Sequence, residues 1–329
     1  MNRFSDVVPA TIAKQLHFGG EPFPLVLSQQ TRTDHLGAAL EWVKAERHQL
    51  LDQSNKHGAI LFRGFPLHTA EDFDAFVAAF GLENFAYDVS LSNAVRVNRT
   101  ERVFTANEAP PDVTIFLHHE MAQTPLFPSR LFFFCEKPAD VGGATPICRS
   151  DVLLARLGER CPDFVAACQT LGLKYSNVMP LDADRQSGMG RSWKGTFHAT
   201  DQNEAERRMD ELGYTWEWLA DGCLRATTPV LPAVYKLPDG RTSFFNQLIA
   251  AFQGWKDTRN DPSKSITFGN GDPLDPATVE VATQLAEEVT FDVAWQAGDV
   301  ALIDNFVTMH GRRTFEGTRK VLPSLIALD

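Results

Sequence analysis

The chain has 329 residues, of which 43% are hydrophobic and 22% charged, a composition typical of a globular protein and unlike that of a disordered or fibrous chain. Its formal net charge is -11 and it has no long basic block, so the positive footprint of a nucleic-acid binder is absent from the sequence. No apolar run approaches the length of a membrane span, and we expect a cytoplasmic protein without a nucleic-acid or membrane partner.

The five cysteines predict free thiols. Their number is odd, no pair has the CxxC spacing, and the first residues run into no continuous apolar segment of a secretion signal. Structural zinc sites and iron–sulfur clusters need clustered thiolates, so we expect neither.

The first third of the chain is typical of scaffold. Apolar positions at helical spacing predict a helix over 35–57, and a short buried strand follows at 59–65. Thr69 precedes two acidic residues and an apolar stripe, which predicts the N-cap of a second helix ending at Gly81. From 86 to 112 no periodicity is visible, which predicts a long ordered loop.

The remaining residues predict many short strands and a few helices. We expect helices at 151–158, 163–171, 203–212 and 276–288, and strands at 113–120, 131–135, 174–178, 231–237, 242–248 and within 291–310. Two polar stretches, 182–195 and 253–276, are predicted to be surface excursions and candidate lids over a site.

With no internal repeat or linker, this pattern predicts one α+β domain over 1–329. We expect a helical layer over about 1–85 and a β core over about 86–329, of the jelly-roll type that cupins also use.

His118 and Glu120 are the first residues whose spacing indicates chemistry. In a strand over 113–120, side chains two apart share a face, so His118 and Glu120 project together while His119 points away. A distant strand that runs from Asp304 ends at His310. Two imidazoles and one carboxylate, with three coordination positions left open, form the set with which non-haem Fe(II) oxygenases hold iron. Taken singly, each residue is more often a packed histidine or a solvated acid.

Several short motifs surround these residues. They are Leu117-His118-His119-Glu120-Met121, Phe132-Phe133-Phe134-Cys135, Gly142-Gly143-Ala144-Thr145-Pro146-Ile147, Asp304-Asn305, His310-Gly311-Arg312, Phe315-Glu316-Gly317 and Arg319. Together they resemble the taurine dioxygenase family, and within it the clavaminate synthase-like and syringomycin aspartyl-hydroxylase-like branch. The resemblance covers about residues 55–327.

This resemblance implies a double-stranded β-helix fold, a mononuclear Fe(II) centre, 2-oxoglutarate as co-substrate and O₂ as oxidant. It assigns the iron ligands to His118, Glu120 and His310. Family members more often have Asp at the carboxylate position, but the named branch also uses Glu. The retained carboxylate argues against halogenation, because related halogenases lack it to make room for chloride.

The same resemblance implies that Arg319 pairs with the distal carboxylate of 2-oxoglutarate and that Thr145 donates a hydrogen bond to it. Arginine suits this role because its planar, permanently charged fork matches a carboxylate. The family's arginine often follows the distal histidine at a slightly longer interval than the nine residues from His310 to Arg319. Arg312 and Arg313 are therefore competing candidates, although Arg312 better suits a role in bracing its strand.

The implied reaction is hydroxylation of an unactivated C–H bond in a small amino-acid-like or carboxylate substrate of specialised metabolism, free or tethered to a carrier protein. Candidate substrate contacts are Arg96, Asn98 and Arg102 in the long loop, with Asn246 and Gln247 further along. Ordinary loop polarity would explain these five residues as well.

Three alternatives stay open. A desaturase or cyclase would use the same cofactors, and a β-barrel isomerase or dioxygenase without 2-oxoglutarate would need no arginine for a distal carboxylate. A non-catalytic metal-binding β-barrel would keep the ligands without the chemistry. The sequence predicts no oligomeric state.

Overall fold

The computed structural model describes residues 6–31, 35–87, 90–92, 94, 96–106, 109–184, 190–254, 259 and 265–328. Its largest sheet has six strands in the order β1-β4-β5-β17-β7-β20, and only the β4–β5 pair is parallel. These strands are β1 (Val7–Ala10), β4 (Leu25–Gln29), β5 (Ala59–Arg63), β17 (Val300–Asp304), β7 (Arg130–Lys137) and β20 (Lys320–Ile326).

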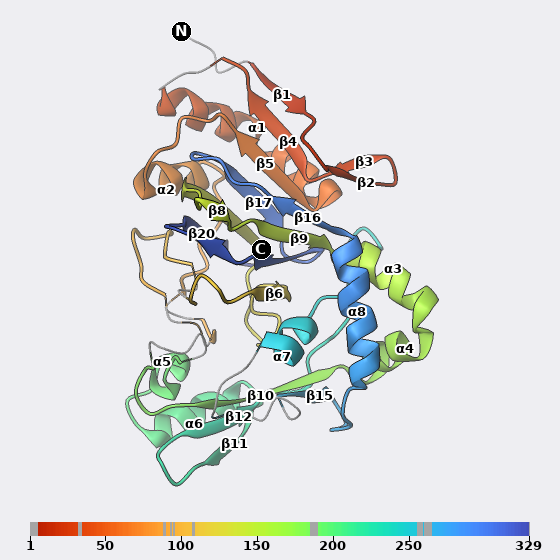
Figure 1. Ribbon diagram of the computed structural model, residues 1–329. Helices are drawn as coiled ribbons and strands as arrows, with labels where there is room; N and C mark the ends of the chain where they lie inside the picture. Colours follow the sequence, from red (N-terminus) through yellow and green to blue (C-terminus); the bar gives the residue numbers. More distant parts are fainter. Residues whose placement is uncertain are drawn as a thin grey trace.

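Two helices cover the outer face of this sheet (Figure 1). Helix α1 (Leu36–His57) ends at Gly58, whose φ of 80° lies in the left-handed region that glycine adopts without strain. Helix α2 (Ala70–Ala78) begins with the expected cap, since Thr69 accepts a hydrogen bond from the Asp72 N–H and the Asp72 carboxylate accepts one from the Thr69 N–H. Both helices confirm their predictions within a few residues.

The N-terminal layer is not purely helical, which corrects the expected division near residue 86. Residues 6–31, for which no element was predicted, form β1, β4 and the hairpin of β2 (Leu16–Phe18) and β3 (Glu21–Phe23). Because β1, β4 and β5 extend the six-stranded sheet, the first 85 residues share their sheet with the β core.

A second sheet, ordered β16-β9-β18-β6, faces the first. It contains β16 (Thr290–Val293), β9 (Thr145–Arg149), β18 (Thr308–Arg312) and β6 (Ile115–His118), all antiparallel. Buried side chains from both sheets form one cluster, with Leu61, Phe133 and Ile303 from the first and Ile147 and Phe291 from the second. This pairing gives the predicted jelly roll, and burial of these side chains from water is the main force that holds it together.

The chain passes from one sheet to the other at residues 305–307. The expected single strand from Asp304 to His310 is therefore two strands, β17 and β18, in different sheets. Asp304 makes the turn, because its carboxylate accepts a hydrogen bond from the Phe306 N–H at 2.9 Å and its carbonyl accepts one from Val307 at 3.3 Å. This corner brings His310 beside β6.

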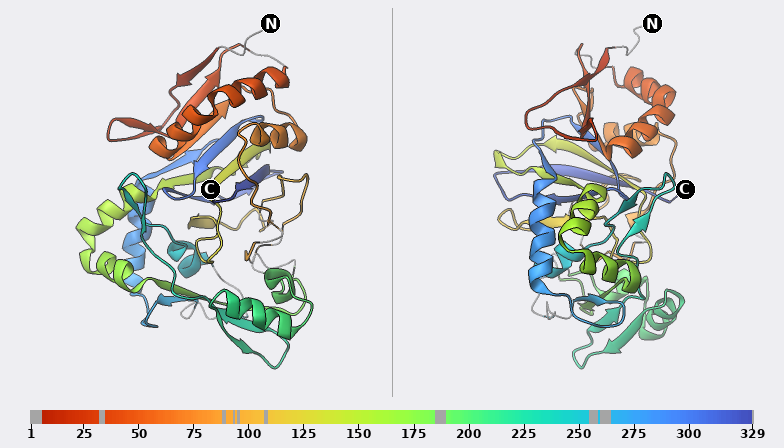
Figure 2. Two further views of the ribbon diagram at one scale, coloured as in Figure 1. Left: turned by 180° about the vertical axis from the view of Figure 1, so that it is seen from behind. Right: turned by 90° about the vertical axis from the view of Figure 1, so that its right-hand side faces the viewer.

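A third sheet lies on the far side of β6, and helices lie around it and beside the second sheet (Figures 1 and 2). The sheet is ordered β11 (Thr215–Trp218), β12 (Leu224–Thr227), β10 (Leu173–Met179) and β15 (Ile266–Phe268). The helices are α3 (Ser150–Arg160), α4 (Pro162–Leu171), α5 (Trp193–Phe197), α6 (Gln202–Glu211), α7 (Leu248–Gly254) and α8 (Pro276–Glu288). Of these, α5 and α6 pack on β11 and β12 through one apolar cluster.

Two of the expected strands are much shorter than predicted. Within 231–237 and 242–248, Tyr235–Lys236 (β13) pairs with Thr242–Ser243 (β14), and Leu231 forms a single bridge with Leu173. Helix α7 begins at Leu248, where a strand was expected to end. Two further pairs of residues, β8 (Val141–Gly142) and β19 (Phe315–Glu316), form another short ladder.

The two polar excursions contain regular structure where they are described. Helix α5 lies at the end of 182–195, and β15 lies within 253–276. Residues 185–189, 255–258 and 260–264 fall outside the described part of the chain, so the lid prediction rests partly on residues without a description.

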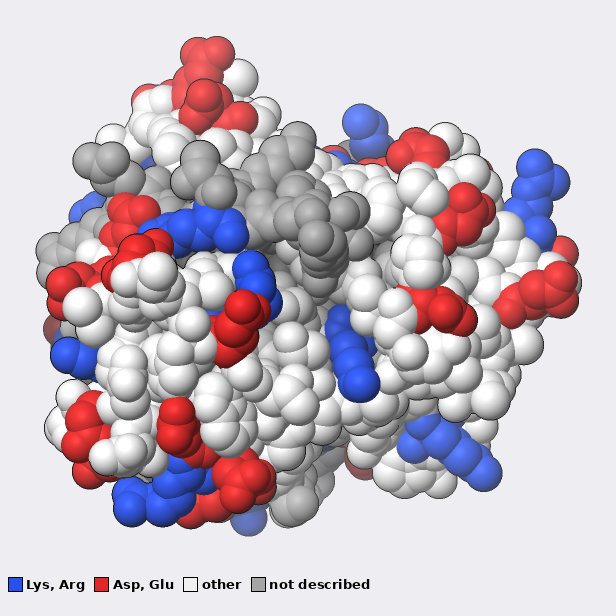
Figure 3. Space-filling model, turned by 90° about the horizontal axis from the view of Figure 1, so that it is seen from below, with Lys and Arg blue, Asp and Glu red and all other residues white. Residues whose placement is uncertain are grey.

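No helix in the described part of the chain is long and apolar enough to cross a membrane. On the face shown in Figure 3, acidic and basic side chains are interspersed and neither sign forms a continuous patch among the described residues. All five cysteines are free thiols, as expected.

Candidate metal centre

Three predicted residues meet between β6 and β18. His118 ends β6 and pairs in register with His310 on β18, and Glu120 follows two residues after His118. One ligand atom from each lies within 4.8 Å of the others, and no other group of three such residues is found in the described chain. The two imidazole rings are 4.4 Å apart between centroids.

Glu120 reaches this position from a turn, because β6 stops at His118 and not at residue 120 as expected. Met121 has a φ of 57°, which bends the chain sharply just after the carboxylate. The Asn305 side chain holds the turn: it accepts a hydrogen bond from the Glu120 N–H at 2.8 Å and donates one to the Glu120 carbonyl at 3.1 Å. Asn305 belongs to the corner between the two sheets, so this corner also fixes the acid.

His119 lies outside the group of three, as the strand argument predicted. Its Nδ1 contacts the Asn305 carbonyl and its ring packs on Phe245, with centroids 4.8 Å apart. Its own N–H donates to the Asn246 carbonyl at 3.3 Å, and the Gln247 amide donates to its carbonyl at 2.9 Å. His119 therefore anchors the underside of the turn that carries Glu120.

Hydrogen bonding and charge prepare the three side chains for a cation. The Phe116 carbonyl lies 2.7 Å from His118 Nδ1 and, being only an acceptor, keeps that nitrogen protonated and leaves Nε2 with its lone pair. Burial, with His310 nearby, lowers the pKa of His118 to about 4. Burial alone would raise the pKa of Glu120, but Arg96 and His310 outweigh it and hold that pKa well below its usual range.

Arg96 is the only one of the five expected substrate contacts that lines this pocket among the described residues. Its Nη2 lies 3.0 Å from Glu120 Oε1, and its guanidinium carbon lies 4.7 Å from the Tyr87 ring centroid and 5.2 Å from that of Phe104. Its Nε is buried without a hydrogen-bond partner. Burial opposes the charge of Arg96, but Glu120 outweighs it and raises the pKa of the guanidinium.

Arg319 and Thr145 meet on the opposite side of the same pocket. Arg319 donates to the Gly143 carbonyl at 2.8 Å and to the Thr145 hydroxyl at 3.0 Å, so both acceptors are neutral. Burial, with Arg312 nearby, lowers the pKa of Arg319 to about 10. A Cβ on Gly143 would lie 3.1 Å from Arg319 Cδ and 2.8 Å from another side chain, so this close approach requires glycine.

The two competing arginines lie elsewhere. Arg312 donates to the carbonyls of Ala109, Pro110 and Val113, and thereby braces the end of the long loop. Arg313 pairs with Glu287 at 2.6 Å and with Asp292 at 2.9 Å. Arg312 borders the pocket with a side chain committed to backbone carbonyls, whereas Arg313 already has two carboxylates.

The other expected substrate contacts are not brought to this pocket, which corrects that interpretation for them. Arg102 pairs with Asp74 at 3.0 Å and Asn98 forms a bridge with Phe104. Asn246 is fully buried, with its amide donating to the Ala233 carbonyl at 3.0 Å. Gln247 is buried too, and its side chain holds the carbonyl of His119 as described above.

Sequence reasoning missed two residues of the site, Asn305 and Trp295. The Trp295 indole N–H donates to Thr145 Oγ1 at 2.9 Å. Asn305 stood within a quoted motif, but its role depends on contacts with residues more than 170 positions away. No local pattern in the sequence indicates either contact.

The donor set and the pocket fit an Fe(II) ion and a dicarboxylate. Two imidazoles and a carboxylate suit Fe(II), and a cavity of about 70 Å³ joins them to a half-buried arginine whose described partners carry no negative charge. Comparison with known proteins agrees. Residues 21–324 match the model of the family described as taurine catabolism dioxygenase TauD, TfdA family. The chain belongs to this family.

Two curated relatives are similar over most of their length. A clavaminate synthase-like protein of Arabidopsis thaliana is 42% identical over 325 residues, covering 97% of this chain and 98% of the relative. The dapdiamide synthesis protein DdaC of Enterobacter agglomerans is 26% identical over 291 residues, covering 85% of each.

Solved structures share the fold at low sequence identity. PvcB of Pseudomonas aeruginosa, an Fe, α-ketoglutarate dependent oxygenase, superposes with a TM-score of 0.54 at 13% identity, covering 98% of this chain and 92% of its own. The protein is an Fe(II)- and 2-oxoglutarate-dependent dioxygenase with a jelly-roll fold.

Proposed function

We propose that this dioxygenase hydroxylates an unactivated C–H bond of a small amino-acid-like or carboxylate substrate in specialised metabolism. DdaC is named for dapdiamide synthesis and PvcB for an isonitrile synthetic pathway, and both names support a biosynthetic role. The iron ligands in this proposal are His118, Glu120 and His310. With 2-oxoglutarate, Fe(II) bound there would supply the O₂ activation that side chains cannot.

The hydrogen bonding of Thr145 carries the assignment of the co-substrate anchor. Its oxygen accepts from Trp295 and from Arg319, which uses both acceptor lone pairs of a hydroxyl. The Thr145 hydrogen must therefore donate to a further acceptor, and no described residue accepts it. Beside it, Arg319 still has N–H groups to donate. A hydroxyl that can only donate next to a half-buried cation is suited to one ligand group, a carboxylate.

Arg96 supplies the proposed contact with a substrate carboxylate. It pairs with Glu120, is largely shielded from solvent and lies against two aromatic rings that contact each other, so its guanidinium is held in place before any substrate arrives. Its Nε still lacks a partner in the described structure. A substrate carboxylate that pairs with Arg96 would be held beside the metal ligands, where the target C–H bond has to lie.

Succinate formation across a panel of amino acids, with the product mass measured, tests this function. We expect one substrate to gain one oxygen atom with stoichiometric succinate, and we expect Arg96→Gln to raise its KM while the binding of 2-oxoglutarate stays unchanged. Loss of two hydrogens would show desaturation or cyclisation instead. The same panel presented as carrier-bound aminoacyl groups tests whether a carrier protein is the partner.

An enzyme without 2-oxoglutarate, or a barrel without catalysis, would give different results. The first would turn over without succinate. The second would bind Fe(II) and leave every substrate unchanged.

A further inference from the structure

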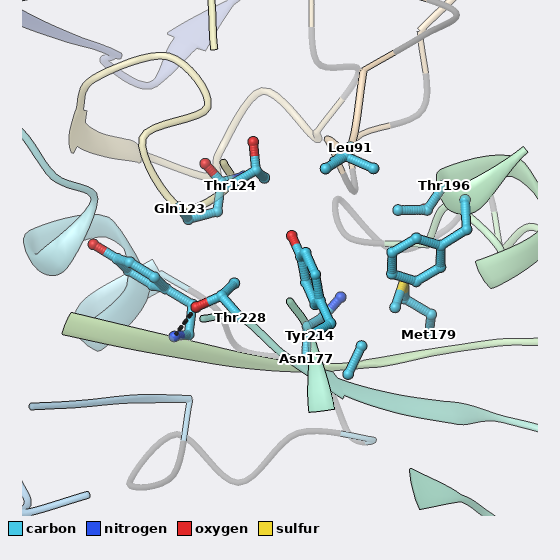
Figure 4. A pocket seen from close by; sticks show the side chains of 11 residues that line it. Leu91, Gln123, Thr124, Asn177, Met179, Thr196, Tyr214 and Thr228 are labelled. Carbon is cyan, nitrogen blue, oxygen red and sulfur yellow. Dashed lines mark hydrogen bonds between the residues drawn. The ribbon is translucent and has the colours of Figure 1, made fainter. Parts of the chain in front are cut away.

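A second cavity lies between the turn that carries Glu120 and the third sheet (Figure 4). Gln123, Thr124 and Leu91 lie on one side of it, and Asn177, Tyr214 and Thr228 lie on the other. Tyr175, Asn177 and Met179 alternate along β10 and so share the face that lines it. Its volume is about 30 Å³, room for a small polar group or about two waters.

Three polar side chains in this cavity are buried without partners. Asn177 is 7% exposed and neither its amide nitrogen nor its oxygen has a hydrogen-bond partner in the described structure. Gln123 Oε1 and Thr196 Oγ1 are also without partners, in residues that are 8% and 2% exposed. Leaving such groups unpaired in the interior is unfavourable, so their gathering at one cavity indicates a ligand.

The unmet hydrogen bonds have a definite pattern. Asn177 offers an N–H donor and a carbonyl acceptor, Gln123 offers an acceptor, and Thr196 offers a hydroxyl that can do either. A primary carboxamide has the complementary set, because its NH₂ can donate to both amide oxygens while its carbonyl accepts from Asn177 and Thr196.

Charged groups fit this cavity poorly. No described residue that lines it carries a charge, and burial raises the pKa of Tyr214 so that its phenol stays neutral. A carboxylate or ammonium placed here would be buried without an opposite charge, which is far more costly than burying a neutral amide. Leu91, Met179 and Phe197 supply an apolar wall for an alkyl chain.

The cavity is close to the metal centre along the chain. Gln123 follows Glu120 by three residues in one tight turn, where Ala122 donates to the His119 carbonyl at 3.3 Å and Thr124 donates to the Met121 carbonyl at 2.9 Å. Three residues span at most about 11 Å between their Cα atoms, a length that a small amino-acid derivative can bridge. Tyr175, on the opposite wall, accepts from the N–H of Gln247 beneath the same turn.

We propose that this cavity binds a neutral primary carboxamide of the substrate, with Asn177, Gln123 and Thr196 as its hydrogen-bonding partners. As a statement about the substrate, the proposal rests on the proposed function. It adds a requirement at the end of the substrate away from the reacting carbon: a carboxamide is accepted and the matching carboxylate is rejected.

Matched small molecules test the binding directly. Propionamide, propionate and propylammonium share an ethyl group and differ at the polar end, and their affinities for the full-length protein can be measured by saturation-transfer NMR. We expect propionamide to bind at least 10-fold more tightly than either ion and to appear in the cavity in soaked crystals. Equal affinities, or crystals that show only waters in the cavity, would overturn the proposal.

The variant Asn177→Leu separates a binding role from a structural one. It removes an unpaired buried amide, so we expect an unchanged or higher Tm together with at least a 10-fold loss of propionamide affinity. A lower Tm with unchanged affinity would mean that Asn177 serves the fold and would refute the proposal. Asn84→Leu is the matched control: Asn84 also has a buried unpaired oxygen but lies outside this cavity, and its replacement should leave propionamide binding unchanged.

A separate readout distinguishes this proposal from the proposed function. Anaerobic binding of Fe(II) and 2-oxoglutarate should be the same in Asn177→Leu as in the unaltered protein. Failure of that binding in both proteins would count against the proposed function and leave the propionamide result standing. Normal cofactor binding without any preference for the amide would count against the carboxamide site alone.

Discussion

Replacement of Arg319 by alanine should abolish the preference for a co-substrate with a distal carboxylate. Arg319 uses two of its N–H groups on Gly143 and Thr145, which leaves three of the five guanidinium hydrogens for a ligand. Removing one partner of a buried, hydrogen-bonded charge pair costs about 2–5 kcal/mol. The affinity for 2-oxoglutarate should therefore fall by about 30- to 4,000-fold.

Anaerobic titration of the Fe(II) protein, followed by the absorption band that chelated 2-oxoglutarate gives, measures this affinity. The comparison ligand is 2-oxopentanoate, which has the same chain length and lacks the distal carboxylate. The unaltered protein should prefer 2-oxoglutarate, and Arg319→Ala should bind both ligands equally. Arg319→Lys should recover only part of the preference, because an ammonium cannot hold Gly143, Thr145 and a carboxylate in one plane.

Arg313→Ala is the control for this experiment, since Arg313 also follows His310 closely but pairs with Glu287 and Asp292. It should bind 2-oxoglutarate like the unaltered protein. If Arg319→Ala kept its preference for the dicarboxylate while Arg313→Ala lost it, the assignment from Thr145 and its donors would be refuted.

Three further changes have defined outcomes. Asn305→Leu removes both side-chain hydrogen bonds that hold Glu120, so Fe(II) affinity in equilibrium dialysis should fall about 10- to 100-fold. Trp295→Phe removes one donor to Thr145 and should raise the KM for 2-oxoglutarate about 5-fold, the equivalent of about 1 kcal/mol. Burial raises the pKa of Asp304 from 3.8 to about 6, so its ionisation destabilises the fold as pH rises between these values. Asp304→Asn should add about 3 kcal/mol of unfolding free energy at pH 7.5 and little at pH 4, measured by urea unfolding.

Local signals in the sequence predicted the elements whose ends are set by local contacts. Gly58 ends α1 and Thr69 caps α2 through bonds within a few residues, and both are visible in the sequence. The hairpin of β2 and β3 was not predicted because each strand has three residues, too few to show an alternation of apolar and polar side chains. Short strands depend on their partners for stability, and a single sequence does not reveal those partners.

The errors around the metal centre have one cause. Apolar and polar residues keep alternating through 113–120 and 304–310, so each segment was expected to be one strand, whereas each contains a turn. The first turn is held by Asn305, 185 positions from Glu120. The three residues were still expected, correctly, to lie close together, because Glu120 returns to the same side of the chain as His118.

Asn246 and Gln247 show the limit of reasoning from polarity. In a sequence, a polar pair in a turn has the same appearance whether it binds a substrate or a backbone carbonyl. Here the pair binds backbone groups around His119 and Ala233, which places both residues beneath the metal centre. Arg96 differs from them because its guanidinium pairs with the Glu120 carboxylate and lies against the rings of Tyr87 and Phe104.

The proposed metal and 2-oxoglutarate site and the proposed carboxamide cavity depend on different sheets. The proposed metal ligands lie on or beside β6 and β18, and Thr145 lies on β9, so all of them depend on the jelly roll. Asn177 lies on β10 in the third sheet, and Thr196 lies on α5, which packs against that sheet. Substitutions there leave the six-stranded sheet and its partner untouched. On the two proposals above, substrate specificity can change through the third sheet while the proposed Fe(II) and 2-oxoglutarate sites keep their geometry, because the turn that lines the second cavity connects β6 to β7 and Asn305 holds it in place from the jelly-roll side.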